Sequence, residues 1–192
     1  NNTQKLAAFY NQNLLKDAYS QDHFQKTLTE KLPDYQSSFE EQARNYNLDW
    51  ELLVAIGYQE SHLDANAVSP TGVRGLMMLT NNTAKAMGVS DRVDPYQSIG
   101  GGARYLEQMR DDFSDVPKTD RIWFALAGYN MGPNAVKGIQ RKLRNQGIND
   151  KSWANVYAYL ADNKASNSRY GQAMHYVSNI RSYLETIKTQ TV

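Results

Sequence analysis

The stretch Asp49-Trp-Glu-Leu-Leu-Val-Ala-Ile-Gly-Tyr-Gln-Glu-Ser-His-Leu63 decides the fold of this chain. Asp49 is a good N-cap residue, because its carboxylate can accept hydrogen bonds from the first turn of a helix. From Leu52 to Gly57 there is no polar residue, and a helix that is apolar on all sides lies in a core. The sequence therefore predicts a buried helix here, against which the rest of the chain packs.

Glu60 lies on the apolar side of that helix. Counting back by three, four, seven and eight residues reaches Gly57, Ile56, Leu53 and Leu52. Burial disfavours the charged form of a carboxyl group, so we expect a raised pKa, which a general acid needs near neutral pH. The alternative for a lone acid in a helix is a structural Glu that pairs with an arginine or a backbone group.

Composition limits the possible classes of protein. A length of 192 residues suffices for one domain with a substantial core. With 21 basic and 20 acidic residues the formal charge is +1, which argues against a nucleic-acid partner. No stretch resembles a membrane span or a signal peptide, so an exported protein would have lost its targeting segment. The chain lacks Cys, and His23, His62 and His175 show no ligand spacing, so we expect neither a metal nor a cofactor.

Helical periodicity continues along the chain, and no strand alternation of useful length appears. We expect one or two helices over residues 3–31, then helices over 39–46, 81–87, 95–113, 120–130, 134–144, 153–160 and 170–187. Pro33 interrupts the first part. We therefore expect residues 1–34 to form a helical extension or connector and residues 35–192 to form one all-α domain. The Gly100-Gly-Gly102 run predicts close packing of its helix against a neighbour.

A run of basic residues marks the predicted helix over 134–144. Its cations are Lys137, Arg141, Lys142 and Arg144. A solvated helix face explains such a run, and contact with an anionic ligand is the alternative.

Four short motifs follow one another in the sequence: Gln59-Glu60-Ser61, Gly75-Leu-Met-Met-Leu-Thr80, Ala127-Gly-Tyr-Asn-Met-Gly-Pro133 and His175-Tyr176-Val177. In their order and spacing they resemble the motifs of the lytic transglycosylases with the soluble-type catalytic module. The resemblance covers about residues 35–184. It implies an all-α, lysozyme-like helical domain of the goose type, with a substrate cleft.

The resemblance also implies roles for individual residues. Glu60 takes the place of the catalytic acid. The implied substrate-binding residues are Ser61, Gln59, Met77, Met78, Tyr129, Asn130 and Tyr176. Local capping is the alternative for Ser61, and core packing is the alternative for Tyr176.

Two positions depart from the family pattern. Met78 stands where most members have Gln, and Gln172 stands where many have Glu. The Met-Met form looks most like membrane-bound lytic murein transglycosylases of type F, in which the catalytic module follows a solute-binding-protein-like domain. That likeness implies an upstream regulatory domain, and a place in the bacterial periplasm associated with the outer membrane.

The implied chemistry is cleavage of the MurNAc-GlcNAc β-1,4 bond in peptidoglycan glycan strands, by a monomer, leaving 1,6-anhydroMurNAc ends. Glycosidases usually need two carboxylates, but a single acid suffices when the substrate supplies its own nucleophile. The four motifs contain only Glu60; Asp64 is the rival second carboxylate, or else a loop cap. A goose-type lysozyme hydrolase and a non-catalytic murein-binding module remain alternatives.

Overall fold

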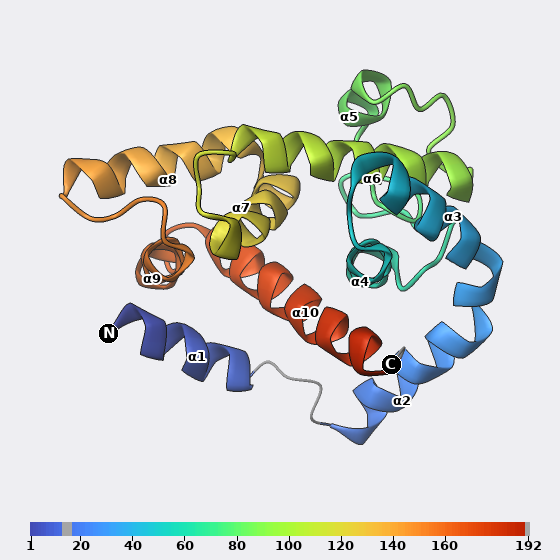
Figure 1. The fold of residues 1–192 in the computed structure, drawn as a ribbon, viewed down its shortest axis with the longest axis horizontal. Helices are drawn as coiled ribbons and strands as arrows, with labels where there is room; N and C mark the ends of the chain where they lie inside the picture. The colour runs from blue at the N-terminus through green and yellow to red at the C-terminus, as the bar shows by residue number, and fades with distance from the viewer. Residues whose placement is uncertain (13–16, 191–192) are drawn as a thin grey trace. The chain divides into compact units, whose positions relative to one another are not determined.

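A computed structural model describes residues 1–12 and 17–190 (Figure 1). Over these residues the chain forms ten helices and no strand, apart from isolated bridges in the loop around Arg74. The helices are α1 Asn2–Gln12, α2 Ala18–Glu30, α3 Leu32–Tyr46, α4 Trp50–Ser61, α5 Asn81–Ala86, α6 Pro95–Asp112, α7 Lys118–Met131, α8 Pro133–Asn145, α9 Trp153–Asn163 and α10 Ser168–Gln190. The expectation of an all-α chain is confirmed.

One helix differs clearly from the sequence-based expectation. The α2 helix ends at Glu30, and Pro33 lies in the first turn of the next helix, α3, which begins at Leu32 instead of near residue 39. Proline is tolerated there, because its missing N–H would have no partner within the helix and its φ is already helical. The sequence marks a boundary correctly at this point, but the boundary is the start of a helix.

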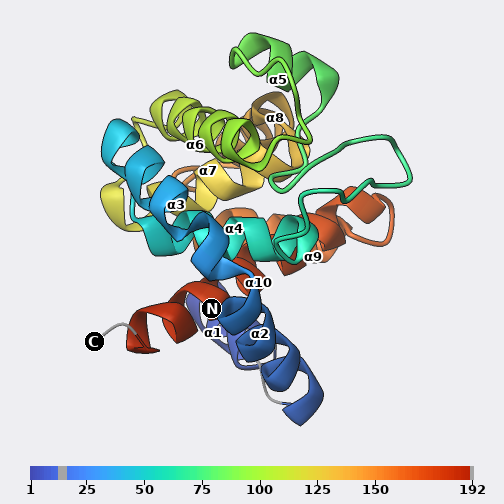
Figure 2. The ribbon, with the colours of Figure 1, turned by 90° about the vertical axis from the view of Figure 1, so that its right-hand side faces the viewer.

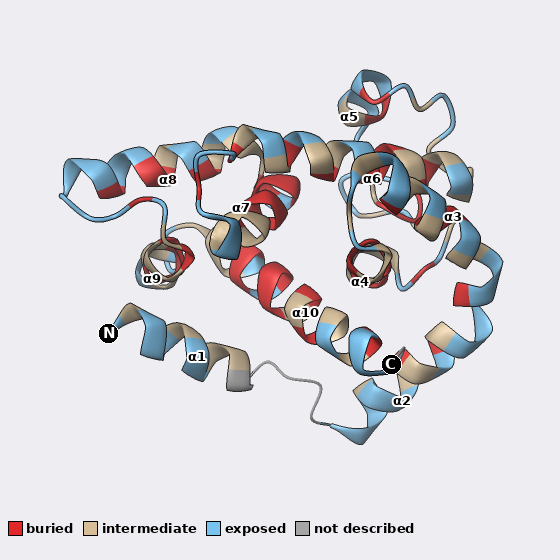
Figure 3. Cartoon of the chain, viewed as in Figure 1, coloured by how far each residue is buried: buried red, intermediate tan, exposed pale blue. Residues whose placement is uncertain are grey.

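The helix α4 is buried as predicted, and every residue from Leu52 to Tyr58 belongs to the core (Figure 3). Asp49 is its N-cap residue, but the Asp49 carboxylate accepts no capping hydrogen bond. It forms an ion pair with Lys188 instead, with 2.9 Å between Nζ and Oδ2. The helix ends where His62 adopts a left-handed conformation, with φ of 54°.

The chain divides into two compact units. One comprises Asn1–Leu14 and Gln108–Asn179, and the other comprises Leu15–Glu107 and Ile180–Val192. Two of the three boundaries fall inside α6 and α10, so each of these helices contributes residues to both units.

In the unit that contains α4, α3 packs against α4 and α2 packs against α3 (Figures 1 and 2). An aromatic cluster holds the C-terminal part of α10 in this unit. The Phe24 ring stacks on Tyr183 with centroids 5.2 Å apart and meets Tyr58 edge-on at 4.8 Å. Such ring pairs contribute about 0.5–1.5 kcal/mol each beyond the area that they bury.

In the other unit, α7 packs on α8 and α1 packs on α9. Trp153 connects several of these helices: its ring meets Phe124 edge-on at 5.8 Å, and its indole N–H donates to Tyr10 Oη at 3.2 Å. The Phe9 ring lies 5.2 Å from that of Tyr157. The α1 helix, which lies in the expected N-terminal extension, is therefore packed onto the helices of this unit.

Candidate active site

Glu60 lies in the last turn of α4 and is half-buried. Burial raises the pKa of its carboxyl group to about 8, and neither a hydrogen bond nor a neighbouring charge contributes to this shift. At pH 7 the protonated form therefore predominates by about tenfold. The pKa agrees with the expectation from the apolar stripe of the helix. The structure thus presents a carboxylic acid that retains a transferable proton at neutral pH.

The next residue, Ser61, joins the end of α4 to the loop that contains the second motif. Its Oγ lies 2.7 Å from the carbonyl oxygen of Leu76 and 3.1 Å from that of Gly57, and it donates its proton to these acceptors. A serine that bonds to the carbonyl of the preceding helical turn is common. The bond to Leu76 is not local, because it fixes the second motif against the helix that carries Glu60.

The loop around the second motif is held by two further side chains from outside it. Ser98, which is fully buried on α6, accepts the backbone N–H of Met77 at 3.0 Å. Arg92 donates from Nη1 to the carbonyl oxygen of Leu79 at 2.9 Å and to that of Gly72 at 3.3 Å. Buried backbone groups need such partners, because an unpaired one costs about 1–3 kcal/mol.

Two glycines permit this close packing. Gly75 has φ of 90°, and a Cβ added there would lie 2.0 Å from the carbonyl oxygen of Arg92. A Cβ on Gly102 would lie 2.8–2.9 Å from three side-chain atoms of Met77. The expectation that the glycine run in α6 permits a close approach is therefore confirmed, and the neighbour is the second motif.

The two methionines of that motif have different environments. Met77 is fully buried against Gly102, whereas Met78 is partly exposed and has φ of 51°. A non-glycine residue with a left-handed backbone is uncommon, and such residues often occur at functional sites. Gln59 is partly exposed beside the acid. Substrate binding by Gln59, Met77 and Met78 stays a prediction.

Asp64 has a local role in the structure. Its Oδ1 accepts the backbone N–H of Asn66 at 2.9 Å, and its own carbonyl oxygen accepts the N–H of Ala67 at 3.2 Å. This is the loop-capping role that the sequence offered as the alternative to a second catalytic carboxylate.

The remaining predicted substrate-binding residues belong to the other unit. Tyr129 is buried and Asn130 is exposed, both in the last turn of α7. Tyr176 lies on α10 and is buried, with 3% of its surface exposed. Within the unit of Glu60, the structure brings Ser61 to the second motif by a direct hydrogen bond. The roles of Tyr129, Asn130 and Tyr176 toward a substrate stay predictions.

Sequence reasoning missed Ser98 and Arg92, which hold the second motif in place. Neither belongs to a motif, and nothing in its neighbours along the chain distinguishes it from an ordinary helix or loop residue. Groups of three or more acidic or His side chains able to hold a metal ion do not occur in the part of the chain that the structure describes.

The chain has counterparts among known proteins. The family model of the transglycosylase SLT domain matches residues 37–154. The chain belongs to this family. The sequence resemblance to lytic transglycosylases is thereby confirmed.

Relatives of this SLT domain include longer proteins. The chain is 44% identical over 174 residues to the membrane-bound lytic murein transglycosylase F of Shewanella pealeana. The aligned region covers 85% of this chain and 36% of the relative. The same figures hold for the protein of that name from Pseudomonas fluorescens strain Pf-5. The SLT-domain chain thus spans about a third of the length of these curated relatives.

Solved structures support the fold of this SLT domain. An inactive mutant of the lytic transglycosylase Slt from Pseudomonas aeruginosa superimposes with a TM-score of 0.60 at 23% identity, over 78% of this chain and 23% of that one. The 70 kDa soluble lytic transglycosylase of Escherichia coli gives a TM-score of 0.58 at 22% identity, with the same coverage. The expected lysozyme-like helical fold is confirmed. None of the described helices is both long and apolar enough to cross a bilayer.

Proposed function

We propose that this chain is the catalytic module of a peptidoglycan lytic transglycosylase, which cleaves the MurNAc-GlcNAc β-1,4 bond and forms 1,6-anhydroMurNAc ends. The observation that carries the proposal is Glu60, an acid that burial keeps protonated near pH 7 without any charged partner. Membership of the transglycosylase SLT family supports the substrate class.

Glu60 serves first as the general acid and then as the general base. As the acid, it gives its proton to the glycosidic oxygen, so that GlcNAc leaves as an alcohol. The 2-acetamido group of MurNAc assists departure, in the manner of substrate-assisted glycosidases. The Glu60 carboxylate then takes the proton of the C6 hydroxyl, whose oxygen closes onto C1. The acid is regenerated and no water is added.

A single carboxylate is consistent with the surroundings of Glu60. A hydrolase of the usual kind needs a second carboxylate about 5–9.5 Å from the first. Asp64, the nearest acid along the chain, is engaged in capping its own loop. This supports a substrate-assisted reaction over a double-carboxylate one.

The remaining site residues have supporting roles in this proposal. Ser61 holds the second motif against the helix of Glu60, which supports a positioning role. Met78 and Gln59 contact the sugar from the partly exposed side of the loop and helix, and Met77 shapes the wall behind them. Tyr129, Asn130 and Tyr176 contribute the aromatic and amide groups for the N-acetyl substituents.

The proposal extends to the protein as a whole. We place residues 35–192 in the catalytic domain and residues 1–34 in a connector from an upstream solute-binding-like regulatory domain. The names of the relatives support a membrane-associated protein that acts on murein. We infer a monomer in the bacterial periplasm, held at the outer membrane through another part of the protein.

Cleavage of purified murein sacculi by the wild-type chain and by Glu60→Gln tests the proposal. The change preserves the shape of the side chain and deletes its transferable proton, so we expect cleavage to fall at least about a hundredfold. Mass spectrometry of the released products should show 1,6-anhydro ends. Reducing ends would instead assign the chain to the goose-type lysozyme hydrolases.

A matched control is Asp64→Asn, which makes the same kind of change to an exposed acid four residues further on. It should retain most of the activity. Near-wild-type activity of Glu60→Gln would refute the role of Glu60, and murein binding without any turnover by the wild type would favour a binding module.

A further inference from the structure

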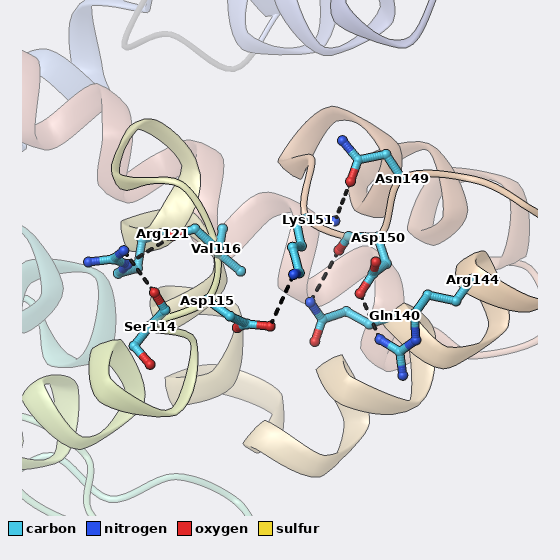
Figure 4. Close-up of polar contacts among 9 residues, drawn as sticks. All are labelled: Ser114, Asp115, Val116, Arg121, Gln140, Arg144, Asn149, Asp150 and Lys151. Atoms are coloured by element: carbon cyan, nitrogen blue, oxygen red, sulfur yellow. Dashed lines mark hydrogen bonds and ion pairs between the residues drawn. The ribbon is translucent and has the colours of Figure 1, made fainter.

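The basic run on α8 is a feature that the proposed reaction does not use. The structure divides its cations between two sides of the helix. Arg144 forms an ion pair with Asp150, with 2.7 Å between Nη1 and Oδ2, and Gln140 donates to the carbonyl oxygen of Asp150 at 3.1 Å (Figure 4). This side of α8 therefore anchors the connection to α9 and is structural.

A pocket lies on another side of α8. Its volume is about 350 Å³, within the range of about 300–1,000 Å³ typical of small-ligand sites. No carboxylate is among the described residues that line it. Its polar lining consists of Arg141, Lys142, Asn145, Asn167, Arg169 and Tyr170. The pocket thus has three cationic side chains in its lining, although the net charge of the whole chain is only +1.

The three cations of this basic pocket are held differently. Arg141 makes no ion pair with any residue that the structure describes. The Lys142 ammonium lies over the Tyr159 ring, 5.7 Å from its centroid, and its hydrogen bond with Tyr159 raises its pKa, so it stays charged. Arg169 donates to the carbonyl oxygen of Met131, which fixes its guanidinium at the wall of the pocket.

Gly138 keeps the basic pocket open beside Arg141. A Cβ added to Gly138 would lie 3.8 Å from Arg141 Nη2, so a longer side chain would occupy the space next to the guanidinium. Gly138 is inside α8, where glycine is about 0.8–1 kcal/mol less favourable than alanine. A substitution here can therefore block the pocket without weakening the helix.

We propose that the basic pocket binds a carboxylate-bearing peptide stem of murein. This inference rests on the proposed function, because the stem is attached to the MurNAc sugar that the site cleaves. Guanidinium groups bind carboxylates with paired hydrogen bonds, and the Asn145 amide can donate to and accept from peptide groups. The Asn167 amide can donate, while its Oδ1 accepts the backbone N–H of Arg169. Met131 also lines the pocket. It directly follows Asn130, and we propose that Asn130 contacts the glycan.

Binding of a synthetic murein tetrapeptide with free carboxylates to the full 192-residue chain tests this assignment. Isothermal titration calorimetry at low salt should show saturable binding that weakens as salt is added, because exposed charges are screened. The fully amidated tetrapeptide should bind at least about fivefold more weakly. Inorganic phosphate is the second probe, since the same cations can hold a free anion.

Two kinds of variant separate the pocket from the general charge of α8. Arg141→Gln with Lys142→Gln removes two cations and should weaken tetrapeptide binding roughly tenfold, because an exposed ion pair contributes only modestly to binding. Gly138→Leu leaves the charge unchanged and should weaken binding as much, by filling the space. Lys137→Gln removes one charge from the same helix outside the pocket, and its dissociation constant should stay within about twofold. Thermal unfolding of each variant checks that it is folded.

Three results would overturn the proposal. They are absence of saturable tetrapeptide binding below about 10 mM, equal affinity for the amidated peptide, or tighter binding of phosphate than of the tetrapeptide. Because binding is measured without cleavage, this result does not depend on Glu60. The loss of turnover in Glu60→Gln can therefore be observed even if the tetrapeptide does not bind. Tetrapeptide binding can likewise be observed even if Glu60→Gln remains active.

Discussion

Substitution of Glu60 by Gln should stabilise the folded chain at neutral pH. Burial raises the pKa of Glu60 from 4.5 to about 8, so the folded state holds a proton that the unfolded state releases between these values. Where the folded state binds more protons, the free energy of unfolding falls as pH rises. The loss of stability that Glu60 causes is therefore absent below pH 4.5. It grows as the pH rises between the two pKa values and reaches its full size above about pH 8.

The magnitude follows from the width of that window. Each pH unit costs about 1.4 kcal/mol, so at pH 7, which is 2.5 units above 4.5, the wild type is destabilised by about 3 kcal/mol. Above pH 8 the destabilisation of the wild type reaches a plateau of about 5 kcal/mol. Gln has no ionisation, so its free energy of unfolding lacks this component. Every other titratable group is common to both proteins and cancels in the difference.

Urea unfolding of the two proteins, followed by tryptophan fluorescence from pH 4 to 9, measures this difference. The advantage of the Gln variant should rise with pH and then reach a plateau. The same pKa should appear as the basic limb of the pH profile of kcat/KM for sacculi, because activity requires the protonated acid in the free enzyme. A difference that does not vary with pH, or a wild type more stable than the variant at pH 7, would refute the burial argument.

Two further substitutions test the packing of the second motif, each measured by urea unfolding. Ser98→Ala should cost about 1–3 kcal/mol, because it leaves the buried N–H of Met77 without its acceptor; a loss below about 0.5 kcal/mol would contradict this role. Gly75→Ala should cost clearly more than Gly72→Ala. Both have positive φ, at a cost of about 1–2 kcal/mol, but only at Gly75 does the new Cβ meet a carbonyl oxygen, at 2.0 Å, whereas nothing lies within 4 Å at Gly72. Equal losses would contradict the steric argument.

Much of the fold could be predicted because local rules and tertiary packing agree. The apolar run from Leu52 to Gly57 permits only a buried helix, and the structure confirms it. Prediction from the sequence fails where a residue is consistent with two different local structures. Pro33 marks either a break or a helix start, and Asp49 can cap a helix or pair with a distant cation. In the structure Pro33 lies at the start of a helix, and Asp49 pairs with Lys188.

The candidate site shows the same division. The spacing of Glu60 along the helix predicts a partly buried acid, and motif order identifies the family to which the chain belongs. The contacts that hold the second motif join residues far apart in the chain: Ser61 bonds to Leu76, and Ser98 bonds to Met77. No periodicity encodes such pairs, because each depends on how two helices and a loop meet in space.

The sequence by itself determined that the chain is helical, that one acid is stranded on an apolar helix, and that its motifs are those of a lytic transglycosylase. These properties depend on residue order within a single helix or a short motif. Only the tertiary structure decided how far the acid is buried, how Gly75 and Gly102 admit the second motif, and which cations of α8 line a pocket. Burial and hydrogen bonding between distant segments are properties of the packed chain, and a sequence pattern specifies only the face that a residue presents to that packing.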